Sequence, residues 1–219
     1  LTTGKHSKHL EIVGDFNFEV KTPLRDSYYL HTKRHDLSYK CICLWDNKRQ
    51  WKFCGVAHTV MKCMDKPQYN HSDELYCPDV YLHSRDTGNR SADPQKYFKD
   101  GGRLQKQFFD TLYYDPDGLN NRSVFYAAQS YMDAQKFDLS LKWYSLYLKL
   151  KYTWVEEEFE ANTRIARILI HLQKPYEEIA KYINAATKIF PDRAEPYYIL
   201  GKHCNYIDRQ EEAYQLLKK

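Results

Sequence analysis

Histidine and cysteine side chains are the first groups in this sequence that suggest chemistry, and that chemistry would be zinc binding. The chain of 219 residues has nine histidines and six cysteines. Structural zinc sites combine closely spaced cysteine pairs with closely spaced histidine pairs. No Cys-x-x-Cys pair occurs here, and Cys41 and Cys43 only alternate as they would along a strand. The spacing therefore argues against structural zinc and favours reduced thiols in a cytoplasmic compartment.

Charge and hydropathy exclude two further kinds of partner. The formal net charge is +4, with 42% hydrophobic and 28% charged residues, which is ordinary for a globular protein. Nucleic-acid binders concentrate basic residues on one face, so no nucleic-acid partner is expected. The sequence has no run of about eighteen apolar residues and no signal-peptide pattern, so no transmembrane segment is expected. A peripheral membrane role stays open.

The second half of the chain has the periodicity of amphipathic helices. From Asn121 onward, apolar residues recur three and four positions apart. Tyr197, Leu200, Gly201 and Ala213 match a tetratricopeptide-like repeat, whose small residues let paired helices approach closely. The pattern predicts an all-α stack of helical hairpins over residues 101–219.

Two earlier units fit the same template at a period of about 34 residues. Their matching residues are Tyr176, Ile179, Ala186 and Pro191 in one unit, and Ala127, Ala128, Tyr131, Phe137, Ser140 and Tyr144 in the other. About five extra residues near 151–154 separate these two units. The aromatic residues, Trp143 among them, are either core or the wall of a short peptide-binding groove.

The first half reads as strands. Short runs rich in aromatic and β-branched residues are bounded by turn residues. The predicted strands are 16–20, 27–32, 39–45 and 50–60, with Asp46-Asn47-Lys48 as a hairpin turn between the last two. Residues 86–100 read as a loop that leads to a helix from about Gly102 to Tyr113. The overall class is α+β, with a first domain over residues 1–100.

Five sequence blocks stand in an order that resembles one enzyme family. The blocks are 51–58 (Trp-Lys-Phe-Cys-Gly-Val-Ala-His), 83–100 with Gly88-Asn89-Arg90-Ser91, 115–117 (Asp-Pro-Asp), 121–131 with Phe-Tyr-Ala-Ala-Gln-Ser-Tyr, and 154–159 (Trp-Val-Glu-Glu-Glu-Phe). The chain resembles, from Tyr28 to Lys219, the acceptor-side half of a family 2 glycosyltransferase of the GT-A fold with fused tetratricopeptide-like repeats. The resemblance implies that the nucleotide-binding half with its Asp-x-Asp motif lies before Leu1. The Asp115-Pro116-Asp117 segment has a turn as its plain explanation.

The resemblance also implies a set of site residues. His83 stands where such enzymes complete the shell of a divalent Mn or Mg cofactor. Arg90, Lys96 and Lys99 would bind the donor diphosphate, and Trp51, with Trp45 nearby, would stack on an acceptor sugar. Each set also has a plain structural explanation. His83 would be a polar residue that ends a strand, the three basic residues would lie in a solvated loop, and the two tryptophans would be strand aromatics in a core.

His58 matches the catalytic histidine of the family's His-Glu pair, but Thr59 follows where the family has glutamate. Threonine cannot act as a carboxylate base. Another acid, such as Asp65, Asp73 or Glu74, would have to substitute, or the activity is altered or lost.

Two functions therefore compete. The first is a metal-dependent glycosyltransferase that moves a sugar from a nucleotide-sugar donor to a glycan, lipid or protein acceptor, when this chain is part of a longer one. The alternative is a non-catalytic interaction module, in which the helical repeats bind a protein partner and the first half is a degenerate transferase remnant. Thr59 favours the alternative.

Overall fold

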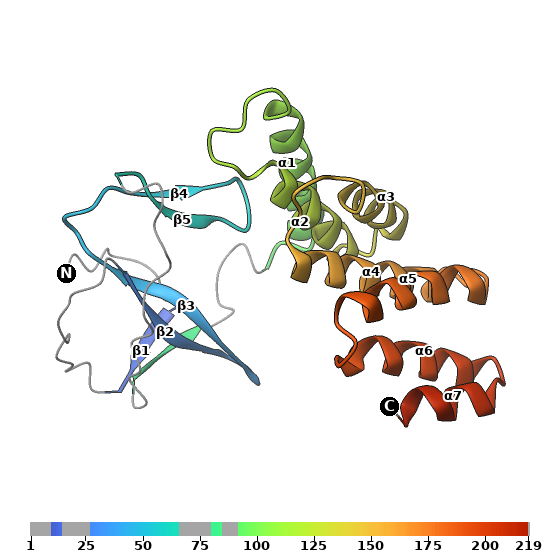
Figure 1. Cartoon of the computed structure of the whole chain (residues 1–219). Coiled ribbons are helices and arrows are strands. Elements are labelled where there is room, and N and C mark those ends of the chain that lie inside the picture. Colours follow the sequence, from blue (N-terminus) through green and yellow to red (C-terminus); the bar gives the residue numbers. More distant parts are fainter. Residues whose placement is uncertain (1–9, 15–26, 66–79, 85–91, 219) are drawn as a thin grey trace. The chain divides into compact units, whose positions relative to one another are not determined.

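The computed structural model describes residues 10–14, 27–65, 80–84 and 92–218, and its class is α+β, with strands first and helices after them (Figure 1). The chain divides into two compact units. The strand unit comprises Leu1–Cys54 and Thr59–Lys96, and the helical unit comprises Gly55–His58 and Tyr97–Lys219. The predicted division into domains at residue 100 stays a prediction.

The strand unit contains a four-stranded sheet with the order β1-β6-β2-β3. Its strands are β1 (Leu10–Val13), β2 (Ser27–Arg34), β3 (Leu37–Trp45) and β6 (Tyr81–Ser84). β2 and β3 form an antiparallel hairpin, β1 runs antiparallel to β6, and only β2 and β6 are parallel. β4 (Trp51–Cys54) and β5 (Val60–Cys63) form a separate antiparallel pair.

The strand predictions are confirmed in part. The predicted strands 27–32 and 39–45 lie within β2 and β3, whereas 16–20 lies outside the described residues. The predicted strand 50–60 is wrong as a single strand, because Gly55 and His58 have φ angles of 97° and 48° that turn the chain back. Residues 46–48 do form a turn, held by the Lys48 N–H donating to Asp46 Oδ1 at 2.9 Å. That turn is not a hairpin turn, because β3 pairs with β2 and β4 pairs with β5. The GT-A-like region is not confirmed.

Helix α1 (Lys96–Asp110) begins earlier than the sequence predicts. The glycine pair Gly101-Gly102 looked like a helix start, but it lies inside the helix. A Cβ on Gly101 would lie 2.8 Å from the ring of the buried Tyr131, whereas a Cβ on Gly102 would meet nothing within 4 Å. Gly101 therefore serves close packing of two helices and not a turn.

The remaining helices form three antiparallel hairpins, α2 with α3, α4 with α5, and α6 with α7 (Figure 1). Their bounds are α2 Asn120–Asp133, α3 Phe137–Tyr147, α4 Val155–His171, α5 Tyr176–Ile189, α6 Ala194–Tyr206 and α7 Gln210–Leu217. The predicted stack of helical hairpins is confirmed.

The first helix of each hairpin ends in the same backbone motif. Gln135, Gln173 and Asp208 have φ angles of 57°, 53° and 63°. The residue after each one donates its N–H back to the preceding helix, at 2.8, 2.9 and 2.8 Å. This is the Schellman pattern, which satisfies carbonyl groups that the end of a helix leaves unpaired. Its threefold recurrence is structural evidence that the hairpins are repeats.

Small residues hold the paired helices together, as the repeat pattern predicts. Ala127 and Ala128 on α2 are fully buried, and Ser140 Oγ on α3 donates to the Ala128 carbonyl at 2.8 Å. A Cβ on Gly201 of α6 would lie 2.7 Å from Leu217 Cγ of α7. The core of the unit therefore lies between helices that approach closely at these positions.

An ion-pair network joins the second hairpin to the third. Arg193, which precedes α6, contacts Glu156 and Glu160 of α4 at 3.0 and 3.7 Å and Glu195 at 2.6 Å. Its guanidinium also lies 4.0 Å from the centroid of the Phe159 ring. Because each hairpin can bury its apolar face only against a neighbour, such contacts fix the register between units.

Candidate functional site

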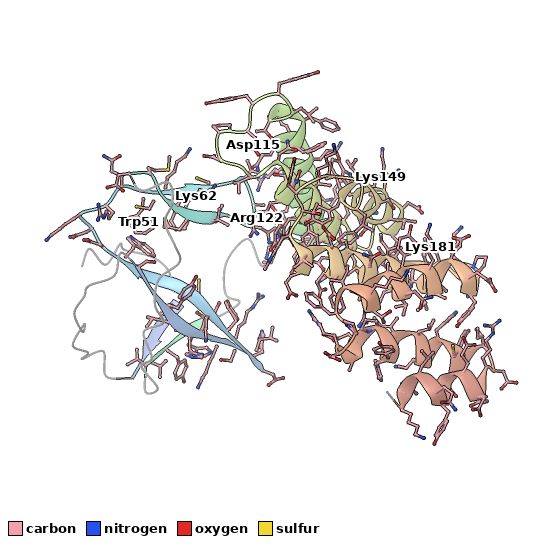
Figure 2. All side chains as sticks on the ribbon, viewed as in Figure 1. Trp51, Lys62, Asp115, Arg122, Lys149 and Lys181 are labelled. Carbon is pink, nitrogen blue, oxygen red and sulfur yellow. The ribbon has the colours of Figure 1, made fainter. Side chains whose placement is uncertain are left out.

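The predicted site residues of the strand unit lie in ordinary sheet positions. Trp51, labelled in Figure 2, begins β4. Its Nε1–H donates to the Asp46 carbonyl at 2.8 Å, so the indole holds the preceding turn. His83 is half-buried in β6, opposite Glu11 of β1 and Lys33 of β2. Whether Trp51 binds an acceptor or His83 a metal stays a prediction.

Two of the three predicted diphosphate-binding residues lie at the start of α1. Lys96 and Lys99 lie in the first turn of α1, and the Lys96 N–H donates to the Asp93 carbonyl at 3.0 Å. Arg90 lies outside the described residues.

Asp115 caps α2, because its carboxylate accepts the N–H groups of Leu119 and Asn120 at 3.0 and 2.7 Å. The Gly118 N–H donates to the Asp115 carbonyl at 3.1 Å, which confirms the turn predicted at residues 115–117.

His58 belongs to the helical unit and contacts α2. Its ring is stacked on the Tyr126 ring with centroids 4.3 Å apart, and its carbonyl accepts a hydrogen bond from Arg122 Nη2 at 3.4 Å. The Val56 N–H in the same loop donates to Gln107 Oε1 of α1 at 2.8 Å. The loop 55–58 is thus fastened to α1 and α2, and a catalytic role of His58 stays a prediction.

A buried polar cluster next to His58 joins three helices. The Tyr147 hydroxyl donates to Glu157 Oε2 at 2.9 Å and accepts the Trp154 N–H at 3.2 Å. Arg122, labelled in Figure 2, forms an ion pair with Glu157. The distance between Arg122 Nη1 and Glu157 Oε1 is 3.6 Å. Burial raises the pKa of Glu157, and burial together with that carboxylate raises the pKa of Tyr147. These contacts tie α2, α3 and α4 together, and sequence reasoning missed them because Tyr147 and Glu157 meet only through the fold.

No metal centre emerges from the described part of the chain, where no group of three His, Cys, Asp or Glu side chains is placed to hold an ion. His58 and His83 fall in different units. The divalent-cation prediction stays untested. The helices of the described residues are all too short or too polar to span a bilayer.

A groove runs across the first helices of the three hairpins. One hollow of about 630 Å³ is lined from α2, α4 and α6 by Met132, Arg167, Ile170, His171, Gln173, Tyr198, Ile199, Lys202, His203 and Tyr206. A second hollow of about 300 Å³ shares Met132, Arg167 and Ile199 with the first. We call these two hollows together the α2–α4–α6 groove. Sequence reasoning predicted such a groove in outline but not its residues.

The groove has an apolar floor and exposed aromatic side chains, and its two hollows differ in their charged residues. Ile199 is buried at its floor, while Tyr198 and Tyr206 are 54% and 82% exposed. In the smaller hollow, Glu160 is paired with Arg164 at 3.1 Å. The larger hollow has basic residues and no acidic ones. A concave apolar surface with a few polar groups can bind a ligand.

Exposed aromatic side chains at the groove resemble those of binding surfaces. Lys202 Nζ lies 5.4 Å from the Tyr198 ring centroid. His203 Nδ1 is buried without a hydrogen-bond partner among the described residues, and burial lowers the pKa of His203. The side chain is therefore mostly neutral near pH 7 and can hydrogen-bond to a ligand.

Comparisons with known proteins support no enzyme family. No family model matches this sequence, and no curated protein matches it. Two solved structures that match are a "MamA RS-1 ArsTM double mutant", 14% identical over 60% of this chain and 73% of that chain, with a TM-score of 0.41, and MamA from residue 41 of Desulfovibrio magneticus RS-1, 15% identical with the same coverage and a TM-score of 0.40.

The resemblance to family 2 glycosyltransferases is wrong. No family model, whether of a transferase or of any other family, matches this sequence. One block of the resemblance, residues 125–131, lies in α2, where Phe125, Ala128 and Tyr131 are buried in the helical core. Helix packing in the stack therefore explains residues that looked family-specific. The predicted nucleotide-sugar chemistry and metal dependence lose their support with the family.

Proposed function

We propose that this chain is a protein-interaction module, whose α2–α4–α6 groove binds a segment of another protein. The observation that carries the proposal is the groove itself, an apolar hollow that crosses all three hairpins and exposes Tyr198 and Tyr206. Aromatic residues at a concave surface are common anchors of protein interfaces. The charged groups that line the smaller hollow are mostly engaged in ion pairs, which fits positioning better than catalysis.

A matched pair of tyrosines allows a direct test of this function. Tyr198 on α6 lines the groove, whereas Tyr214 on α7 lines neither hollow, and the two are 54% and 58% exposed. Each lies near a lysine four residues later, with centroid distances of 5.4 and 5.7 Å. Replacement by alanine therefore removes a similar side chain at each position, with little effect on the core.

The measurement is binding of peptides selected from a random displayed library against the purified chain. Tyr198→Ala should weaken the selected peptides about ten-fold or more, because an anchoring aromatic is worth at least about 1.4 kcal/mol. Tyr214→Ala should leave their affinity within about two-fold. Equal losses in both variants, or no specific binder at all, would remove the groove from the proposal.

A further inference from the structure

The larger hollow of the groove has a one-sided charge. Two of its lining residues are positively charged, Arg167 on α4 and Lys202 on α6, and two are histidines, His171 on α4 and His203 on α6. None of its lining residues is acidic. Among the described residues, neither Arg167 nor Lys202 forms an ion pair within 4.0 Å, and the ammonium group of Lys202 lies over the Tyr198 ring. We call these four residues the basic end of the groove.

The acidic residues of the adjoining hollow are already engaged. Glu160 pairs with Arg164 at 3.1 Å, and Glu195 pairs with Arg193 at 2.6 Å. The hydrogen bond from Arg193 holds the pKa of Glu195 below its usual value, and the charge of Arg167 adds only a smaller effect. Both carboxylates line the smaller hollow together with Arg167, but each has another arginine as its ion-pair partner.

Helix dipoles account for only part of this basic cluster. Basic side chains are favourable near a helix C-terminus, but the effect is confined to the last turn. His171 and His203 lie in the last turns of α4 and α6. Arg167 and Lys202 each lie four residues before the end of their helix, where the dipole contributes little. A binding role explains these two residues better.

We infer that the segment bound in the groove is an acidic peptide, with glutamate or aspartate residues on either side of an apolar side chain. This inference rests on the proposed function. The apolar side chain packs between Ile170, Ile199 and Tyr198. The carboxylates meet Arg167, whose planar guanidinium can bind a carboxylate with two hydrogen bonds, and Lys202. Complementary charge then supplies specificity and fast association.

The test uses the whole chain and three fluorescent peptides of about twelve residues, a length that can span such a groove. Leucine alternates with glutamate in the first peptide, with glutamine in the second and with lysine in the third. The variants are Arg167→Glu, Lys202→Glu and their double variant. Lys218→Glu is the matched control, because Lys218 also lies over a tyrosine, at 5.7 Å from the Tyr214 ring, and lines neither hollow.

The expected result is that the glutamate peptide binds at least about ten-fold tighter than the glutamine peptide, and that its affinity falls as salt is raised from about 50 to 500 mM. Lys202→Glu and Arg167→Glu should each weaken it about ten-fold, whereas Lys218→Glu should change it less than about two-fold. The double variant should bind the lysine peptide instead. This exchange of charge preference cannot arise from misfolding.

Three results would overturn the inference, and they differ in what they leave of the proposed function. If the glutamine or lysine peptide binds the unaltered chain as tightly as the glutamate peptide, and Tyr198→Ala abolishes that binding, the groove binds peptides but does not select acidic ones. If Lys218→Glu weakens the glutamate peptide as much as Lys202→Glu does, the attraction is general and not located in the groove. Failure of all three peptides to bind would count against both proposals.

Discussion

Two neighbouring glycines in α1 illustrate how single residues act in this molecule. Gly101 and Gly102 share one helix, yet only Gly101 faces a buried ring, that of Tyr131. Tyr131 is 4% exposed and its hydroxyl donates to Gln105 Oε1 at 2.9 Å. Because the ring is buried and its hydroxyl is hydrogen-bonded, it cannot easily move away from an added methyl group.

This difference predicts opposite effects of the same substitution. Gly101→Ala should destabilise the chain by about 1–3 kcal/mol, because the new methyl group overpacks against Tyr131. Gly102→Ala should stabilise it by about 0.5–1 kcal/mol, because alanine is the better helix former and meets no neighbour. Urea unfolding of the two variants measures both effects. A stability gain at Gly101 would mean that α1 and α2 do not approach as closely as described.

At the scale of the element, each hairpin turn contains a residue with a left-handed backbone. Gln135, Gln173 and Asp208 have positive φ angles, which cost a residue with a Cβ about 1 kcal/mol relative to glycine. Glycine is the usual residue at this position of the Schellman motif, but none of the three hairpins has it. The sequence therefore gives little warning of these turns.

Gln135→Gly should raise the free energy of unfolding by about 0.5–1 kcal/mol, because glycine relieves the left-handed conformation. Gln135 is exposed and lines neither hollow of the groove, so binding should not change. The midpoint of thermal unfolding reports the gain. Gln135→Ala serves as the control and should give none, since alanine keeps the Cβ. A similar gain with alanine would show that the turn is not strained.

The elements themselves were predictable to different degrees. The helix pairs followed from apolar residues three and four apart, and from small residues such as Gly201 and Ala213 that the packing requires. The start of α1 could not be predicted. The pair Gly101-Gly102 favours a loop locally, and only contact with Tyr131 favours a helix. The prediction of a single strand over residues 50–60 was wrong because residues 55–58 form a turn. Contacts with α1 and α2, which are distant in the sequence, hold that turn.

At the scale of the whole molecule, the motif resemblance predicted a wrong family, whereas the repeat periodicity predicted the helical stack correctly. Phe125, Ala128 and Tyr131 looked like a family signature but are core residues of α2. The groove was foreseen only as a possibility, since Arg167 and Lys202 come together from neighbouring hairpins, with the whole of α5 between them in the sequence. Residues of a binding surface carry no local pattern, and the fold alone assembles them.

The central claim is that the concave face of α2, α4 and α6 is a protein-binding surface. Hydrogen–deuterium exchange of the whole chain, with and without a saturating displayed peptide, tests it most directly. Binding should slow exchange in segments 167–173 and 198–206, which line the groove, and leave α5 (Tyr176–Ile189) unchanged. Protection confined to α5, α7 or the strand unit would contradict the account.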